Sequence, residues 1–374
     1  MVFWVITSVA IFWHSGFVLK YLSAWRSLFF EKIPEHLSTE NFYSILIAAR
    51  NEEGKIKQCI EDLLVQSFPA DRFEVIVIDD FSEDATAEMV KSIGDKRLRL
   101  LQRTADDGFL PNKKGAISYG IQESRGNWIL ATDADCRRSV DWLNAVDRVI
   151  SYYNPDMVVG PVVLTENSLF GKLQQLEFAS VHGVSAAAIS LKQPNTCHGS
   201  NIGYRKERFF ELNGFEGNEH FASGDDEFMM HKIHLNQPGS VRFVPLADAL
   251  VFTDSSKTIR DFYHQRKRWV SKSRSYVMPG VTRELVFIYL YNLWLFCSIV
   301  LSVFGIMSIL QPVLLFSIKL IMEYLFMKRA CSFFGISERL RLLLFVQIFH
   351  VIYILVMGVT AQFGGYTWKG RKLK

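Results

Sequence analysis

The 374-residue sequence has only five cysteines, and their spacing fits neither a zinc site nor a disulfide framework. No two of them form a C-x-x-C pair, so reduced thiols are expected. The formal net charge of +4 is too small to indicate a nucleic-acid partner. The chain also has no internal repeat and no low-complexity tract. These absences argue against a disulfide-rich domain, a zinc finger and a nucleic-acid-binding protein.

Long apolar runs are present, and they lie at the two ends of the chain. Residues 2–19 come close to the roughly 20 residues that cross a bilayer as a helix. No basic residue precedes this run and no clear cleavage site follows it, which favours an uncleaved anchor over a signal peptide. Lys20, Arg26 and Lys32 follow the run and predict that the domain after it is cytoplasmic.

The C-terminal part of the chain contains three further apolar stretches, at residues 285–310, 312–327 and 340–363. Three complete crossings would leave the basic residues Lys369 and Arg371 outside the cell, against the positive-inside rule. One stretch is therefore expected to be re-entrant or interfacial. Lys319 and Glu323 make the second stretch the weakest candidate for a lipid-exposed span.

The central part of the chain alternates short β-branched runs with helical patterns. Strands are predicted at residues 43–48, 73–78, 98–101 and 128–131. This alternation is typical of an α/β fold with a largely parallel sheet covered by helices. No G-x-G-x-x-G follows the first strand, which argues against a dinucleotide-dependent oxidoreductase.

Polar side chains follow three of these strands, at the sheet edge where ligands of parallel sheets gather. They come after the first, second and fourth strands, at residues 48–53, Asp79 with Asp80, and Asp133 with Asp135. Two carboxylates in one turn suit Mg²⁺ or Mn²⁺ and leave coordination positions for phosphate oxygens. Because a D-x-D pair is common by chance, the assignment of a metal site here depends on the other polar residues at the same sheet edge.

An acidic pair opens a later predicted helix. The helix dipole and the preference for Asp at helix starts make capping the structural explanation of Asp225. Asp226, one residue further on, is the candidate that faces a cleft and acts as a general base.

The segment 260–274 mixes aromatic with basic residues, as in a helix that lies at a membrane surface. Arg266 and Lys267 are assigned to its lipid side. Its other face combines an amide, a guanidinium and an indole, from Gln265, Arg268 and Trp269.

Seven blocks occur in order between residues 44 and 269. They read S-I-L-I-A-A-R-N-E-E, E-V-I-V-I-D-D-F-S-E-D-A-T, N-K-K-G-A-I-S-Y-G-I, A-T-D-A-D-C, G-S-N-I-G-Y-R-K, S-G-D-D-E-F and Q-R-K-R-W. Together they resemble the inverting, membrane-bound family 2 glycosyltransferases, which include polysaccharide synthases and ceramide glucosyltransferases. The resemblance implies a GT-A nucleotide-sugar domain and a Mg²⁺ or Mn²⁺ cofactor.

The resemblance also implies roles for single residues. Asp226 matches the catalytic base and Asp135 the metal ligand. The positions that match the nucleotide-sugar site are Ala48, Arg50, Glu52, Asp79, Asp80, Lys113 and Asp133. An acceptor-side block matches Gly199, Ser200 and Asn201, and the Q-x-x-R-W block matches Gln265, Arg268 and Trp269. Two departures, alanine for a usual proline near residue 48 and Asp-Asp for Glu-Asp at 225–226, preserve the backbone contact and the charge.

The predicted organisation has four parts: a transmembrane anchor at 1–25, a GT-A domain at 40–255, an interfacial helix at 256–284 and a transmembrane region at 285–374. The predicted function is inverting transfer of a sugar from a nucleotide sugar, expected to be a UDP-sugar, to a lipid or lipid-linked saccharide. The predicted location is a bacterial-type cell membrane, with the catalytic domain cytoplasmic.

Three alternatives stay open. A processive polysaccharide synthase needs a channel wall that few spans provide. A catalytically silent scaffold would not need these acidic and basic residues, and a small transporter would need polar or broken spans.

Overall fold

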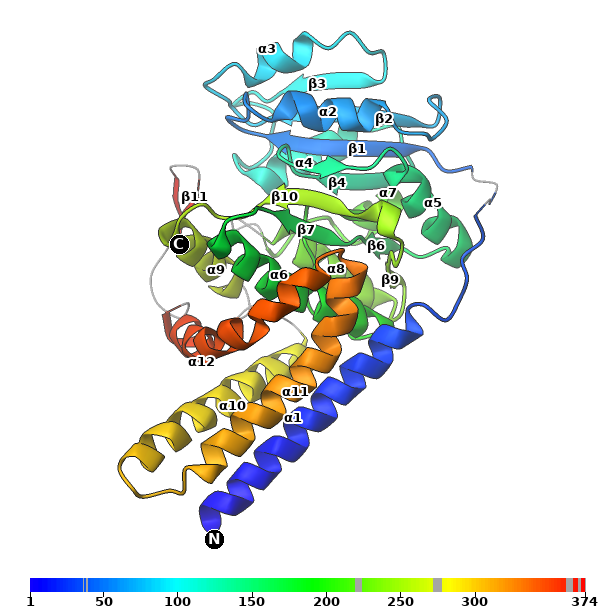
Figure 1. Cartoon of the computed structure of the whole chain (residues 1–374). Coiled ribbons are helices and arrows are strands. Elements are labelled where there is room, and N and C mark those ends of the chain that lie inside the picture. Colours follow the sequence, from blue (N-terminus) through cyan, green and yellow to red (C-terminus); the bar gives the residue numbers. More distant parts are fainter. Residues whose placement is uncertain are drawn as a thin grey trace. The chain divides into compact units, whose positions relative to one another are not determined.

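The computed structural model of the chain describes residues 1–35, 37, 40–218, 224–271, 278–360, 366–368 and 371–373. Parts of three predicted features lie outside these residues: Ser223 of the acidic block, 272–274 of the basic helix and 361–363 of the last apolar stretch. The chain forms two compact units, each made of separate stretches (Figure 1). We call residues 28–165 with 194–254 the sheet unit, and residues 1–27, 166–193 and 255–374 the helical unit.

The sheet unit contains a seven-stranded sheet. Its strands are β1 (Tyr43–Ala49), β2 (Phe73–Asp79), β3 (Leu98–Gln102), β4 (Trp128–Thr132), β6 (Met157–Val159), β8 (Ile202–Arg205) and β9 (Val241–Phe243). They lie in the order β3-β2-β1-β4-β8-β6-β9, and of these described strands β8 alone runs antiparallel to its neighbours. The predicted α/β fold with a mostly parallel sheet is therefore confirmed.

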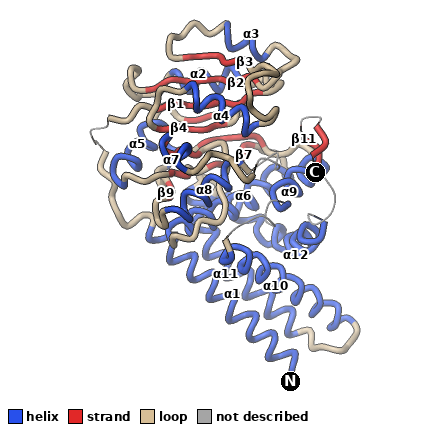
Figure 2. Tube along the Cα trace, turned by 180° about the vertical axis from the view of Figure 1, so that it is seen from behind, coloured by secondary structure: helices blue, strands red, loops and turns tan. Residues whose placement is uncertain are grey.

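A three-stranded sheet and short helices complete this unit. The strands are β5 (Arg137–Arg138), β7 (Val162–Thr165) and β10 (Val251–Asp254), in the order β5-β10-β7. The helices are α2 (Ile56–Leu64), α3 (Thr86–Lys91), α4 (Lys113–Glu123), α5 (Trp142–Tyr153), α7 (Lys206–Glu211), α8 (Asp225–Asn236) and the 3-10 turn η1 (Ala247–Ala249). Figure 2 shows helices flanking the strands of the larger sheet.

The central strands form because their β-branched residues can be buried on both faces. Every residue of β2 and β4 is buried, and so is every residue of β1 except Ala48, which is half-buried. The four predicted strands are found, each extended by one residue at its carboxyl end. Because β1, β2 and β4 are parallel and β1 pairs with both others, the polar residues after all three share one edge.

The helical unit is built mainly from long helices. They are α1 (Val2–Ser27), α6 (Leu169–Ser190), α9 (Ile259–Ser271), α10 (Pro279–Val303), α11 (Leu310–Phe333) and α12 (Leu343–Thr360), with the 3-10 turn η3 (Ser337–Leu342) before α12. The short strands β11 (Tyr366–Trp368) and β12 (Arg371–Leu373) pair with each other. Within the described residues, four helices are long and apolar enough to cross a membrane: Val2–Ser27, Gly280–Val303, Leu310–Phe333 and Ser337–Thr360.

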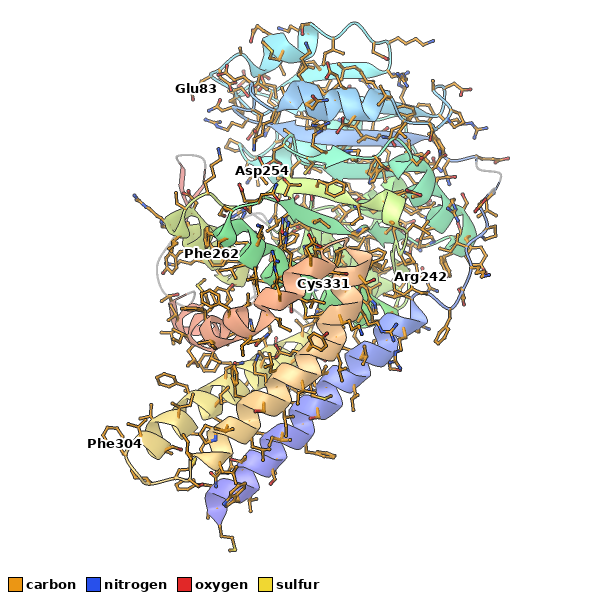
Figure 3. All side chains as sticks on the ribbon, viewed as in Figure 1. Glu83, Arg242, Asp254, Phe262, Phe304 and Cys331 are labelled. Atoms are coloured by element: carbon orange, nitrogen blue, oxygen red, sulfur yellow. The ribbon has the colours of Figure 1, made fainter. Side chains whose placement is uncertain are left out.

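The candidate membrane-spanning helices pack through aromatic contacts. Trp13 of α1 lies 3.8 Å, centroid to centroid, from Phe287 of α10, and Trp25 contacts Phe326 of α11 at 6.0 Å. Large apolar side chains face outward, and Phe304 in the α10–α11 connection is 73% exposed (Figure 3). An exposed apolar surface of this kind suits a lipid environment.

The two charged residues of the second apolar stretch, Lys319 and Glu323 of α11, lie among the helices of the bundle. Lys319 is 1% exposed, and its ammonium lies 2.7 Å from Glu323 one turn later and also donates to Gln347 of α12. Paired charges inside a helix bundle cost much less than a single charge in lipid. The charges that weakened this stretch as a span are therefore shielded by its neighbours.

None of the five cysteines, all in the described part of the chain, forms a disulfide.

Candidate active site

The D-x-D pair occupies the turn directly after β4. The side chains of Asp133 and Asp135 are 33% and 31% exposed. Burial raises the pKa of Asp135, and the negative charge of Asp133 raises it further. Two repelling carboxylates in one turn form a site that a cation would stabilise.

Lys113 lies beside this turn. It is the first residue of α4, a helix whose start is capped by the Asn112 side chain, which accepts a hydrogen bond from the Gly115 amide. The Lys113 ammonium lies 2.8 Å from Asp133 and 3.6 Å from Asp225. Burial lowers the pKa of Lys113, but the charges of Asp133 and Asp225 outweigh it and the pKa is raised. Lys113 is therefore a fixed positive charge between the D-x-D turn and α8.

The start of α8 differs from the expected capping arrangement. The residue at the N-cap position is Gly224, with φ of 87°, and it makes no side-chain capping bond. Asp225 is instead buried and faces Lys113, so the capping explanation of Asp225 was wrong. It failed because glycine adopts the left-handed conformation that this turn requires.

Gly199 brings the general-base candidate into the same cluster. A Cβ atom at Gly199 would lie 3.3 Å from an oxygen of Asp226 and 3.4 Å from the Lys113 nitrogen. Asp226, Lys113 and the backbone before β8 are therefore close neighbours. The absence of a side chain at residue 199 leaves room beside both charged groups.

A second lysine near the D-x-D turn was not predicted from the sequence. Lys55, just before α2, lies 2.9 Å from Asp254 and 3.8 Å from Asp135. Asp254 ends β10 (Figure 3) and also accepts a hydrogen bond from Thr165 at 3.0 Å. Lys55 immediately precedes α2 and Asp254 is the last residue of β10. Only the tertiary structure brings these two residues close to Asp135.

The polar residues after β1 and β2 form a connected network. Arg50 donates to the Asp80 carbonyl at 3.1 Å, and the Asp79 carboxylate accepts from the Ser82 amide at 3.1 Å. The Asp80 carboxylate is buried against Arg103 at 3.0 Å. Arg103, which the sequence interpretation missed, thus fixes the backbone on which Asp79 stands. Ala48 and Glu52 lie half-buried at the same edge.

Two residues of the predicted acceptor-side block are enclosed by protein. The Asn201 amide donates to the carbonyls of Pro161 and Ala249, and its oxygen accepts from the Trp142 indole. Ser200 is 0% exposed and bonds to the His198 ring at 2.8 Å. These contacts shape the loop that carries Gly199. The acceptor-side role of the block stays a prediction.

The Q-x-x-R-W residues lie on α9 in the helical unit. Gln265, Arg268 and Trp269 are half-buried, and Trp269 packs on Phe178 of α6 at 6.0 Å. Arg266, assigned to the lipid side, is instead the most enclosed residue of this helix, at 1% exposed, and is paired with Glu177 of α6. The assignment was wrong because α6, a helix not predicted from the sequence, supplies the partner that a buried guanidinium requires.

The D-x-D turn fits a divalent cation by its donor chemistry. No group of three or more His, Cys, Asp or Glu side chains within the described residues is arranged to hold a metal ion. Two carboxylates with the remaining positions left to water and phosphate oxygens is, however, a common way to bind Mg²⁺. The ammonium groups of Lys55 and Lys113 beside Asp135 and Asp133 mark the turn as a place that attracts positive charge.

Comparison with known proteins agrees with this geometry. Residues 44–212 match the family described as Glycosyl transferase family 2. Glycosyltransferase AglE of Haloferax volcanii is 31% identical over 130 residues, which are 34% of this chain and 41% of that protein. Poly-beta-1,6-N-acetyl-D-glucosamine synthase of Staphylococcus aureus is 23% identical over 268 residues, 70% of this chain and 62% of that protein. The chain thus spans less than two thirds of the length of either relative.

A solved structure shows the same fold. The mannosyltransferase PcManGT from Pyrobaculum calidifontis, in complex with GDP-Man and Mn²⁺, superimposes with a TM-score of 0.58 at 18% sequence identity. The match covers 93% of this chain and 98% of that one. The predicted GT-A fold is therefore confirmed.

Proposed function

We propose that this chain, whose residues 44–212 form a domain of glycosyl transferase family 2, moves a sugar from a nucleotide sugar to an acceptor hydroxyl with inversion of the anomeric carbon. One observation carries the proposal. Lys113 lies between Asp133 of the D-x-D turn and the acidic start of α8, so a cation site, a fixed positive charge and a base candidate meet at one sheet edge.

The roles follow from how charge develops in the reaction. Asp226 takes the proton of the acceptor hydroxyl while the hydroxyl oxygen bonds to the anomeric carbon from the side opposite the diphosphate. The electrons of the broken bond leave with the diphosphate, and Lys113 stabilises the negative charge that develops there. A divalent cation held by Asp133 and Asp135 would supply further positive charge at the diphosphate.

The roles proposed for the remaining site residues come from the resemblance of their motifs to those of family 2 glycosyltransferases. Ala48, Arg50, Glu52, Asp79 and Asp80 bind the nucleoside part of the donor. Gln265, Arg268 and Trp269 serve the diphosphate and the acceptor.

The donor is proposed to be a UDP-sugar, with GDP-mannose as the competing candidate because PcManGT was solved with that nucleotide sugar. The test measures transfer and hydrolysis of UDP-glucose, UDP-N-acetylglucosamine and GDP-mannose by purified protein in detergent, with Mn²⁺, with Mg²⁺ and with a chelator. Cation-dependent release of a nucleoside diphosphate supports the proposal. No release from any nucleotide sugar would contradict it and favour a silent scaffold.

The acceptor is proposed to be a lipid or lipid-linked saccharide at the cytoplasmic face. The support comes from the candidate spans and from the basic residues that follow α1, which favour the cytoplasmic side. Extraction of the product into organic solvent tests the acceptor class.

Helix α12 is proposed to lie at the cytoplasmic surface, while α1, α10 and α11 cross. Basic residues flank α12 on both sides, Arg339 and Arg341 before it and Lys369 and Arg371 after it, so the positive-inside rule places both of its ends in the cytoplasm. Tyr353 of α12 also lies 5.9 Å, centroid to centroid, from Phe262 of the amphipathic α9.

A processive synthase remains a second candidate because of the similarity to the poly-N-acetylglucosamine synthase over 70% of this chain. Product length distinguishes the two functions. Single or few-sugar products support the first, and a long polymer supports the second.

A further inference from the structure

A buried ion pair joins α9 to α6. Arg266 donates to Glu177 through Nε, at 2.9 Å, and through Nη2. Tyr353 of α12 donates to the same carboxylate at 3.4 Å. Because a guanidinium out of water is tolerated only when it is paired in good geometry, this two-point contact fixes where Arg266 lies.

Arg266 also contacts two residues of the Q-x-x-R-W motif. Its Nη1 donates to Gln265 Oε1 at 2.6 Å, and its guanidinium lies over the Trp269 ring, 4.3 Å from the centroid. Ser256 donates to the same Gln265 oxygen at 3.2 Å. The guanidinium therefore links the α6 carboxylate to both the amide and the indole of the motif.

These contacts decide which way the Gln265 amide points. A guanidinium can only donate hydrogen bonds, so the Gln265 side-chain atom that faces Arg266 has to be the amide oxygen. With the oxygen held by Arg266 and Ser256, the amide nitrogen and its two protons point away from them. The nitrogen can then donate to an oxygen acceptor on the side away from Arg266 and Ser256.

We infer that Arg266 and Glu177 are positioning residues, which orient the Gln265 amide so that its NH₂ group donates to a substrate oxygen, a hydroxyl or a phosphate oxygen. This inference rests on the proposed function. The competing explanation is that the pair only packs α9 against α6. The two explanations differ in whether Arg266 acts through Gln265.

Gln265→Glu separates the two halves of the amide. The carboxylate keeps an oxygen toward Arg266 and Ser256 but has no proton to donate outward. We expect kcat for transfer to fall on the order of 10- to 100-fold, in line with the loss of one transition-state donor. The donor KM should stay within about threefold and the unfolding temperature should not fall, since the contact with Arg266 gains charge.

Arg266→Lys tests the positioning role. Lysine keeps the charge for Glu177 but lacks the planar fork that also serves Gln265. We expect a lower kcat in this variant, and no further loss when it is combined with Gln265→Glu. Independent structural effects would instead multiply. Lys267→Gln, the neighbouring charge on α9, is the matched control and should keep wild-type kcat.

The outcomes distinguish this inference from the proposed function. If the wild type transfers sugar and Gln265→Glu retains its kcat, or if the two losses multiply, the inference is overturned and the proposed function stands. If the wild type acts on none of the nucleotide sugars, the proposed function fails and the inference fails with it. A reduced kcat with non-additive losses at an unchanged unfolding temperature supports the inference.

Discussion

Asp135 is the candidate metal ligand in the D-x-D turn after β4. Replacing it with alanine removes one of the two carboxylates of the D-x-D turn but leaves the buried strand beneath it intact. We expect Asp135→Ala to abolish transfer and most Mn²⁺-dependent nucleotide binding without lowering the unfolding temperature. Calorimetry of nucleotide binding with and without Mn²⁺ measures this. Asp248→Ala, at an exposed aspartate on η1, is the control, and unchanged affinity in Asp135→Ala would remove Asp135 from the site.

Asp226 is the general-base candidate, and Asp226→Asn keeps its size while removing its charge. We expect turnover to fall by about two to four orders of magnitude, the usual contribution of a general base, while donor binding stays near wild type. Rapid-quench measurements of transfer together with donor-binding calorimetry test this. Turnover within a few-fold of wild type would end the assignment.

Asp107 shows how pH should act on the network of polar residues that follows β1 and β2. Hydrogen bonds from Arg103 and the charge of that guanidinium hold the pKa of Asp107 below its ordinary value of 3.8. A carboxyl whose pKa is lower in the folded state stabilises the fold above its unfolded pKa of about 3.9 and loses this contribution as pH falls through the folded pKa.

Asp107→Asn should therefore lower the unfolding temperature at pH 7. The difference from wild type should shrink as pH falls below the unfolded-state pKa of about 3.9, because the unfolded wild-type carboxyl is protonated there, and it should vanish once pH falls through the lower folded-state pKa. Thermal unfolding in detergent from pH 7 to pH 3 measures it. A difference that stays constant over this range would mean that Asp107 acts by packing and not by its charge.

At the scale of elements, helix α9 carries both the residues of the Q-x-x-R-W motif and basic residues that are candidates for contact with the membrane surface. Arg268→Ala with Trp269→Ala removes a cation and an aromatic surface, so this double variant should lose transfer yet still sediment with membranes. Arg260→Gln with Lys267→Gln removes basic charge outside the motif and should weaken retention on anionic vesicles while the retained protein stays active. Transfer rate and membrane retention are measured together for both. Equal loss of activity at equal retention would contradict the catalytic assignment.

Helix α6, which was not predicted from the sequence, determines which residues can serve as controls in this test. Arg266 cannot serve as a membrane-face control, because its partner Glu177 lies on α6. The start of α6 does carry a local signal, since the Ser168 side chain accepts from the Gly171 amide as an N-cap. Its many alanine, serine and glycine residues give no clear amphipathic pattern, however, so periodicity alone does not reveal it.

At the scale of the whole molecule, membrane topology follows from the charges that flank each helix. If α1, α10 and α11 cross while α12 stays at the surface, a reporter fused after residue 374 lies in the cytoplasm. We therefore expect a fluorescent protein at this position to fold and an alkaline phosphatase to stay inactive. The opposite result would mean that α12 crosses as well. A reporter inserted in the α10–α11 connection is the matched control and should give the opposite pattern.

The sequence alone determined the first half of the sheet, the D-x-D turn and the apolar helices, because these depend on local patterns. Buried parallel strands are near-continuous apolar runs, and β1, β2 and β4 are apolar at most of their positions, with Ser44 and Glu74 as polar exceptions inside β1 and β2. The late strands β6 to β10 are only three to four residues long where they join either sheet, too short for such a pattern. They could not be predicted.

Only the tertiary structure decided which charges meet. Lys55 and Asp254 are 199 residues apart in sequence, and Glu177 and Arg266 are 89 apart, yet each pair forms an ion pair. Local sequence carries no information on such partners, because the free energy of a charge pair depends on distance and burial, which the packing of distant elements sets. For the same reason Asp225, whose local context favoured a helix cap, became the partner of Lys113.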